Sequence, residues 1–88
     1  MQIKYEARFE KDLRKIQDTK LFKRIKECIN SIKQADSLFE IPQSKKMKGH
    51  ASFYRIKLGD YRIGFELLND NVILTRILHR KDIYRYFP

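Results

Sequence analysis

Apolar and polar residues alternate with a period of two on both sides of a Gly-Asp pair at positions 59 and 60. This pattern predicts antiparallel strands at about 52–58 and 61–68, joined by a two-residue turn with glycine at its first position. Such a turn sets four pairs of residues opposite each other: Leu58 and Tyr61, Lys57 and Arg62, Ile56 and Ile63, Arg55 and Gly64. One face of the predicted hairpin is therefore apolar and aromatic, whereas the other is basic.

The chain before the hairpin shows one short alternating segment and two segments with helical spacing. Residues 2–6 alternate and predict a first strand. Residues 8–17 predict a helix, because their apolar side chains recur at intervals of four and three: Phe9, Leu13 and Ile16. A second helix is predicted from an N-cap at Thr19 to about Ala35. Its apolar stripe runs over about three turns: Leu21, Phe22, Ile25, Cys28, Ile29 and Ile32. Residues 39–44 lack a periodic pattern and are predicted to form a linker.

A third strand is predicted at 72–79, after the turn signal at 69–71. Its register stays open, because the loop length decides which side chains join the face of Ile63. A two-residue loop sends Val72, Leu74 and Arg76 there, and one extra residue sends Ile73, Thr75 and Ile77. Both faces of this strand are largely apolar, so another segment should cover the second face. Residues 81–88 are expected to fold back as a short turn or strand.

These elements predict a single α+β domain over residues 1–88. One strand comes first, two helices follow, and an antiparallel three-strand meander completes a twisted sheet with the helices packed on one face. The helices should pack on the apolar face of the hairpin, which carries Tyr54, Ile56, Ile63 and Phe65. The opposite face is left to Arg55, Lys57 and Arg62.

The charge of the chain limits the classes of partner. Twenty Lys and Arg stand against 11 Asp and Glu, which gives a net charge of +9, and the second half of the chain carries most of the excess. A basic domain of this size most often binds nucleic acid. The sequence has no bilayer-spanning stretch and no signal peptide before the first strand, and the single Cys28 gives no disulfide or metal pattern. We therefore expect a soluble cytoplasmic protein without a metal or cofactor.

The basic face of the hairpin is the strongest indication of function. Like charges directly opposite each other destabilise a sheet by up to roughly 1 kcal/mol, so Lys57 opposite Arg62 favours a polyanionic ligand. Aromatic residues interleave the basic residues and either stack on bases or cover the sheet: Phe53, Tyr84, Tyr86 and Phe87. No glycine-rich phosphate loop or nucleophile elbow accompanies the serines and histidines, which disfavours a Ser-His or Cys-His dyad.

Three motifs in order resemble the RelE toxins of the RelE/ParE superfamily: the run 46–49 (Lys-Met-Lys-Gly), the run 53–63 around the Gly-Asp turn, and the run 79–84 (His-Arg-Lys-Asp-Ile-Tyr). The resemblance covers essentially the whole chain and implies the RelE-like fold. It also implies the toxin of a type II toxin–antitoxin system that enters the 30S A site and cleaves messenger RNA there. The partner implied for neutralisation is an acidic, RelB-like antitoxin.

The resemblance also implies roles for individual residues. In that family the 2′-hydroxyl of the RNA attacks the adjacent phosphorus and gives a 2′,3′-cyclic phosphate. Lys57 matches the general base, Arg62 the group that stabilises charge on the phosphate, and Arg80 the group at the leaving 5′-oxygen. Tyr84 matches the tyrosine that stacks on or orients the substrate, although its spacing from Arg80 is shorter than in the best-known member. A lysine acts as a base where neighbouring cations favour its neutral form.

Further basic residues are expected to bind the RNA backbone: Arg55, Lys46, Lys48 and Lys81. His79 is either an acid or base, as in some relatives, or a strand-end residue without a catalytic role. Two other functions stay open. A ParE-like toxin would inhibit gyrase without nuclease chemistry, and a degenerate member would bind RNA or its antitoxin without cleaving RNA.

Overall fold

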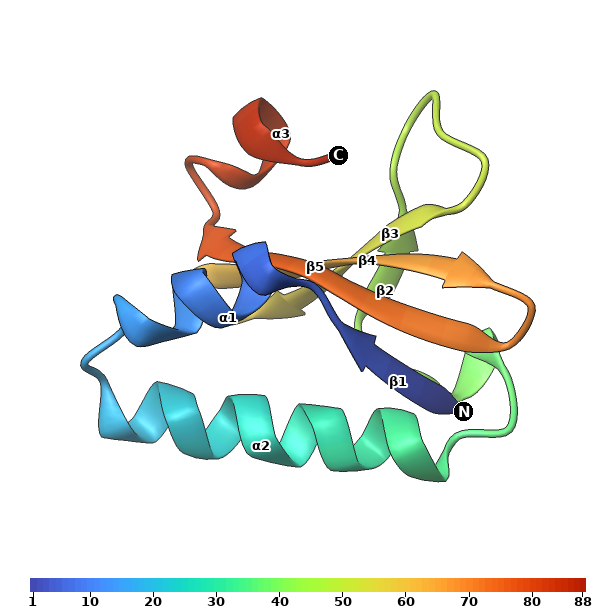
Figure 1. The fold of residues 1–88 in the computed structure, drawn as a ribbon, viewed down its shortest axis with the longest axis horizontal. Coiled ribbons are helices and arrows are strands. Elements are labelled where there is room, and N and C mark those ends of the chain that lie inside the picture. The colour runs from blue at the N-terminus through green and yellow to red at the C-terminus, as the bar shows by residue number, and fades with distance from the viewer.

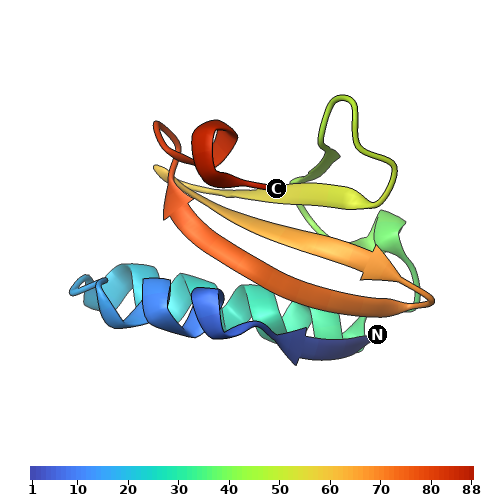
Figure 2. The ribbon, with the colours of Figure 1, turned by 45° about the horizontal axis from the view of Figure 1, so that its top comes forward.

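A five-stranded sheet in the order β1-β5-β4-β3-β2 forms the middle of the molecule, and the computed structural model describes all of residues 1–88 (Figure 1). The chain runs through β1 (Gln2–Tyr5), α1 (Ala7–Arg14), α2 (Thr19–Gln34), the 3-10 turn η1 (Leu38–Glu40), β2 (Ser44–Lys46), β3 (Phe53–Leu58), β4 (Tyr61–Leu68), β5 (Asn71–His79) and α3 (Ile83–Tyr86). Helices α1 and α2 lie on one side of the sheet, and α3 and the β2–β3 loop lie on the other (Figure 2).

The predicted hairpin is confirmed. β3 and β4 pair in the expected register, with Lys57 opposite Arg62 and Ile56 opposite Ile63. Gly59 has a φ of +62°, the left-handed region that glycine enters without a steric penalty. The apolar face of the hairpin joins the two helices in one core cluster of 14 buried residues, so the predicted packing face is also confirmed.

The β4–β5 connection has the two-residue loop, and both of the alternative registers occur in β5. Asn69 and Asp70 have φ values of 48° and 65°, as in a type I′ turn, and Val72 and Leu74 fall opposite Leu67 and Phe65. A bulge between Gly64 and Phe65 then shifts the pairing by one residue. Beyond the bulge Ile77 lies opposite Ile63 on the helix-covered face.

Both predicted helices are present, with different boundaries. α1 ends at Arg14, three residues before the predicted end. The N-cap of α2 is Asp18, not Thr19, because the Asp18 carboxylate accepts a hydrogen bond from the backbone N–H of Leu21 at 3.1 Å. The N-cap therefore lies one residue before the predicted position. None of the helices is both long enough and apolar enough to cross a membrane.

Two expectations about irregular segments were wrong in part. The linker predicted at 39–44 is shorter than expected, because the last two residues of η1 and the first residue of β2 fall within it and β2 pairs antiparallel with β3. The sheet consequently has five strands, with β1 parallel to β5 at the opposite edge. Residues 81–88 fold back as the turn that was one of the two expectations, with Ile83–Tyr86 as the short helix α3, and the alternative of a strand is wrong.

The C-terminal segment covers part of the sheet face that the two long helices leave free. Met47, Ile83 and Phe87 form a second buried cluster there, against Phe53. The ring of Phe87 lies so close to Gly64 that a Cβ at this glycine would stand 2.7 Å from ring carbons. The covering segment that the sequence requires is therefore α3 and the residues that follow it.

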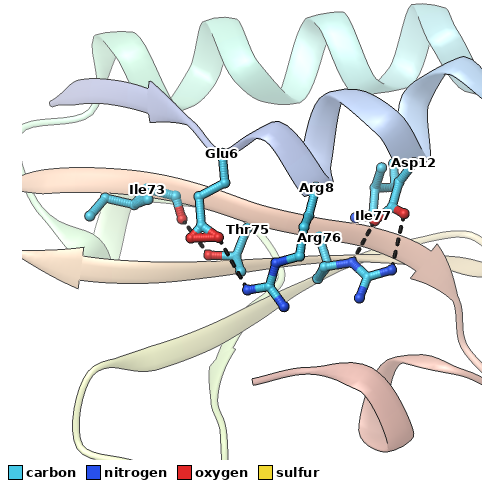
Figure 3. A network of polar contacts seen from close by, with 7 residues as sticks. All are labelled: Glu6, Arg8, Asp12, Ile73, Thr75, Arg76 and Ile77. Carbon is cyan, nitrogen blue, oxygen red and sulfur yellow. Dashed lines mark hydrogen bonds and ion pairs between the residues drawn. The ribbon is translucent and has the colours of Figure 1, made fainter.

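Helix α1 is fixed to the half of β5 that β1 does not reach. The buried carboxylate of Asp12 accepts hydrogen bonds from Arg76 Nε at 2.8 Å, Arg76 Nη2 at 3.1 Å and the backbone N–H of Ile77 at 3.1 Å (Figure 3). This hydrogen bond raises the pKa of the Arg76 guanidinium. Asp12 thus supplies the partner that a neighbouring strand would otherwise give to the Ile77 N–H.

Candidate nucleic-acid interface

The sheet face opposite α1 and α2 carries basic side chains on three neighbouring strands. Arg55 and Lys57 come from β3, and Arg62 comes from β4, as the alternation predicts. The β2–β3 register adds Lys45, which lies opposite Arg55 on the same face. We call Lys45, Arg55, Lys57 and Arg62 the basic face. The sequence pattern does not identify Lys45, because it predicts a linker up to residue 44 and no separate strand that carries this lysine.

The basic face has no acidic partner. The structure contains three ion pairs: Arg8 with Glu6, Arg76 with Asp12, and Arg80 with Asp60. None of them involves a residue of the basic face. Because four cations gather on adjacent strands without a carboxylate among their ion partners, this surface favours an anionic ligand.

The Arg62 side chain forms hydrogen bonds with the backbone of the hairpin turn. Its Nη1 donates hydrogen bonds to the backbone carbonyl of Gly59 at 2.7 Å and to its neighbour, the carbonyl of Tyr61, at 2.9 Å. These acceptors are neutral and the first bond is exposed, so an anionic oxygen would be a stronger acceptor for the same guanidinium.

Arg80 lies at the same turn. Its backbone N–H donates to the carbonyl of Asp60 at 2.7 Å, and its Nε is 3.9 Å from the Asp60 carboxylate. Both side chains of this ion pair are more than half exposed. An exposed pair of this length contributes between 0 and about 1 kcal/mol, which leaves the Arg80 side chain available to a ligand.

The short helix α3 brings Tyr84 to the basic face. The Tyr84 hydroxyl accepts a hydrogen bond from Arg55 Nε at 3.3 Å, and 65% of the tyrosine stays exposed. The buried side chain of Ile83, which packs with Phe87, holds this helix on the sheet. The structure therefore brings together Arg55 and Tyr84, which are 29 positions apart in the sequence.

The other aromatic residues that could stack on bases differ in their positions. Phe87 is buried and Phe53 packs against it with ring centroids 5.5 Å apart, so these two residues cover the sheet. Tyr86 is 49% exposed, but it lines a cavity on the side of α1.

The predicted lysines do not all join the basic face. Lys46 lies opposite Tyr54 and therefore on the face of the helices. Lys48 is exposed in the β2–β3 loop, and Lys81 is exposed after the end of β5. The β2–β3 loop, which carries Lys48, rises on the same side of the sheet as α3 (Figure 2).

His79 lies at the end of β5, opposite Tyr61 in the register and on the helix-covered face. The two rings meet edge to face with centroids 5.6 Å apart. His79 Nδ1 accepts a hydrogen bond from the backbone N–H of Lys81 at 3.2 Å, which leaves Nε2 as the nitrogen without a hydrogen bond to the protein. The alternation thus sends His79 and the basic face to opposite sides of the sheet.

Outside this surface, the structure holds no cluster of three or more His, Cys, Asp or Glu side chains with the arrangement of a metal site. Cys28 lies in the stripe of α2 that faces the core, and burial raises the pKa of its thiol to about 11.

Comparison with known proteins agrees with this architecture. Residues 3–84 match the family described as "ParE toxin of type II toxin-antitoxin system, parDE". The chain is 42% identical over 89 residues to "Toxin RelE3" of Methanocaldococcus jannaschii, with 100% of both chains covered.

Two solved structures share the fold. The first is a RelB–RelE antitoxin–toxin complex from Methanococcus jannaschii, with a TM-score of 0.82, 41% identity, and coverage of 97% of this chain and 99% of that one. The second is a RelE–RelB complex from Pyrococcus horikoshii, with a TM-score of 0.72, 19% identity, and coverage of 90% and 93%. These matches extend over nearly the whole chain and define a toxin of a type II toxin–antitoxin system. The chain belongs to the RelE/ParE superfamily and, within it, to the RelE family.

Proposed function

We propose that this toxin is a ribosome-dependent endoribonuclease that cleaves messenger RNA in the 30S A site and so inhibits translation. The observation that carries the proposal is the basic face: Lys57 stands opposite Arg62 and two residues from Arg55, and none of them has an acidic partner. A scissile phosphate would relieve this repulsion. The fold therefore bears a small electrostatic cost that the substrate removes.

The reaction is a transfer within the RNA. Lys57 Nζ takes the proton of the 2′-hydroxyl, and the 2′-oxygen then attacks the adjacent phosphorus. The bond between phosphorus and the 5′-oxygen breaks, and the departing 5′-oxygen takes a proton from water. The products carry a 2′,3′-cyclic phosphate and a 5′-hydroxyl. Arg62 stabilises the charge on the phosphate oxygens, and Arg80 lies at the 5′-oxygen as it leaves.

Arg62 changes its partners in this mechanism. In the protein without RNA, the Arg62 guanidinium donates hydrogen bonds to the carbonyls of Gly59 and Tyr61. The bound phosphate replaces these neutral acceptors with anionic oxygens, to which charge-assisted hydrogen bonds are roughly twice as strong. Tyr84 stacks on a base beside the phosphate, and its hydrogen bond to Arg55 fixes the angle of the ring. Arg55 and Lys45, together with Lys48 and Lys81, bind the RNA backbone.

The partner in the cell is a RelB-like antitoxin with an acidic toxin-binding part. Two relatives with this fold are found in complex with RelB. An acidic segment complements the net charge of +9. We place both the antitoxin and the ribosomal target in the cytoplasm.

Primer extension on a messenger RNA in a purified translation system tests the function. The native protein should cut the message only when ribosomes are present. Lys57→Ala and Arg62→Ala should each lower the cleavage rate by about a hundred-fold or more, in line with the loss of general base or oxyanion stabilisation. Lys11→Ala, which removes an exposed lysine from α1, is the matched control and should cleave normally. Normal cleavage by both Lys57→Ala and Arg62→Ala would contradict the proposal.

The match to the ParE family is the observation that supports a second candidate function, inhibition of gyrase. Brief induction in cells separates the two functions, because a block in protein synthesis accompanies messenger RNA cleavage, whereas a DNA-damage response accompanies gyrase inhibition. Ribosome binding with intact messenger RNA would instead identify a degenerate toxin.

A further inference from the structure

A cavity of about 450 Å³ opens at the end of β5, between the C-terminal part of α1 and the helix α3. Figure 1 shows these two helices on opposite sides of the sheet, both beside the end of β5. β1 pairs with β5 only as far as Leu74, so the cavity uses the edge of the sheet that has no neighbouring strand. It lies next to Arg80 in the chain, since His79 is part of its wall.

Three aromatic rings line the cavity: Tyr61, His79 and Tyr86. Tyr61 and His79 are paired across β4 and β5, and their rings meet edge to face. Tyr86 comes from α3, where the Arg85 guanidinium lies 5.5 Å from the centroid of its ring. Flat, partly exposed rings are the means by which proteins hold unstacked nucleobases.

Two polar groups in the cavity wall have no partner. Lys15 forms no ion pair. Asp82 is the N-cap residue of α3, but its carboxylate accepts no hydrogen bond from the helix and forms no ion pair. Arg76 also lines the cavity, but its guanidinium is committed to Asp12. The free groups are thus one ammonium donor and one carboxylate acceptor.

We propose that this cavity is a nucleobase-binding subsite, which receives the base on the 3′ side of the scissile phosphate. This inference rests on the proposed function. A base presents N–H donors to Asp82 and carbonyl or ring-nitrogen acceptors to Lys15, and its flat face lies against Tyr86. A phosphate would fit less well, because the Asp82 carboxylate repels it and the one free cation, Lys15, only offsets that repulsion.

The arrangement of α3 supports this path for the RNA. Tyr84 is directed to Arg55 on the basic face, whereas Tyr86 is directed to the cavity. The helix therefore offers one ring on each side of itself. Arg80, the group proposed at the leaving 5′-oxygen, follows His79 directly and precedes the helix, which puts the nucleotide that carries this oxygen beside the cavity.

Titration of the isolated protein with guanosine and uridine 5′-monophosphate, followed by NMR, tests the subsite. Ribose 5-phosphate, which has the phosphate but no base, is the matched probe. We expect the nucleotides to shift the ring signals of Tyr61, His79 and Tyr86 and to bind at least ten-fold more tightly than ribose 5-phosphate. Equal binding of all three compounds would overturn the subsite.

Tyr86→Ala should weaken nucleotide binding by about five-fold or more, since stacking on one aromatic ring accounts for a change of that size. Tyr5→Ala removes a tyrosine of similar exposure from β1 and should leave binding unchanged. Unchanged nucleotide affinity in Tyr86→Ala would contradict the proposal. Lys57→Ala and Arg62→Ala separate the two proposals. If both variants still cleaved RNA while nucleotides bound in the cavity, the catalytic role proposed for the basic face would be wrong and the subsite would stand.

Discussion

Arg55 Nε donates a hydrogen bond to the Tyr84 hydroxyl at 3.3 Å and so links the middle of β3 to α3. This contact gives a way to separate the two roles of the tyrosine, the hydrogen bond and the ring. Tyr84→Phe keeps the ring and frees Arg55, and we expect the RNA cleavage rate to fall about two- to ten-fold.

Tyr84→Ala removes the ring as well and should lower the cleavage rate by at least a further five-fold, because the stacked base loses its partner. Single-turnover cleavage on programmed ribosomes measures both variants. If Phe and Ala at this position gave the same rate, the ring would have no role in holding the substrate.

Gly64 is predicted to be intolerant of any side chain. Gly64→Ala sets a methyl group against the ring of Phe87 at 2.7 Å, and overpacking of this kind costs about 1–3 kcal/mol. Chemical denaturation measures the loss. The double variant with Phe87→Leu should recover part of it, since the smaller side chain withdraws from the added methyl group, and simple additivity of the two losses would argue against the contact.

The Asp12–Arg76 pair is predicted to contribute strongly to stability. Asp12→Ala should cost about 3 kcal/mol, because it leaves a largely buried guanidinium and the Ile77 N–H without their acceptor. The exposed pair of Arg8 and Glu6 is the control, and its removal through Glu6→Ala should cost less than about 1 kcal/mol. Equal losses in the two variants would mean that burial does not strengthen the Asp12 pair.

Cys28 gives a prediction for alkaline pH. Burial raises the pKa of its thiol from 9.0 to about 11, so between these values the unfolded chain has released a proton that the native protein retains. The thiol therefore lowers the free energy of unfolding as the pH rises from 9 to 11, and its contribution is fully favourable below pH 9. Comparison of the native protein with Cys28→Ala by denaturation at pH 8 and pH 10.5 isolates this effect from the lysines.

The rate of alkylation by iodoacetamide gives an independent check on the same thiol. We expect slow reaction of the folded protein at pH 8 and a midpoint near pH 11. A midpoint close to 9 would show that the thiol is solvated.

Sequence patterns predicted the elements that have strong periodicity. The Gly59 turn fixed the β3–β4 register, and with it the placement of Lys57 opposite Arg62. The alternation did not predict the bulge at Gly64 and Phe65, because a bulge adds a residue without a compositional signal, and β5 consequently combines both of the registers that were left open.

Short elements were the ones that sequence patterns missed. β2 has three residues and α3 has four, too few for a period to be recognised, and both are stabilised by contacts with distant residues. The missed strand explains why Lys46 was favoured over Lys45. Once β2 is paired with β3, alternation places Lys45 beside Arg55 and turns Lys46 to the other side.

The sheet separates two apolar clusters of unequal size, with 14 buried residues against the long helices and three against α3. Cooperative melting reports mainly on the larger cluster, whereas the positions of Tyr84 and Tyr86 in α3 depend on the smaller one. Detachment of α3 is thus a local opening that costs less than global unfolding. An unchanged melting temperature does not establish that a variant keeps its substrate-binding surface, and hydrogen exchange at the backbone amides of Arg85 to Phe87 is the measurement that does.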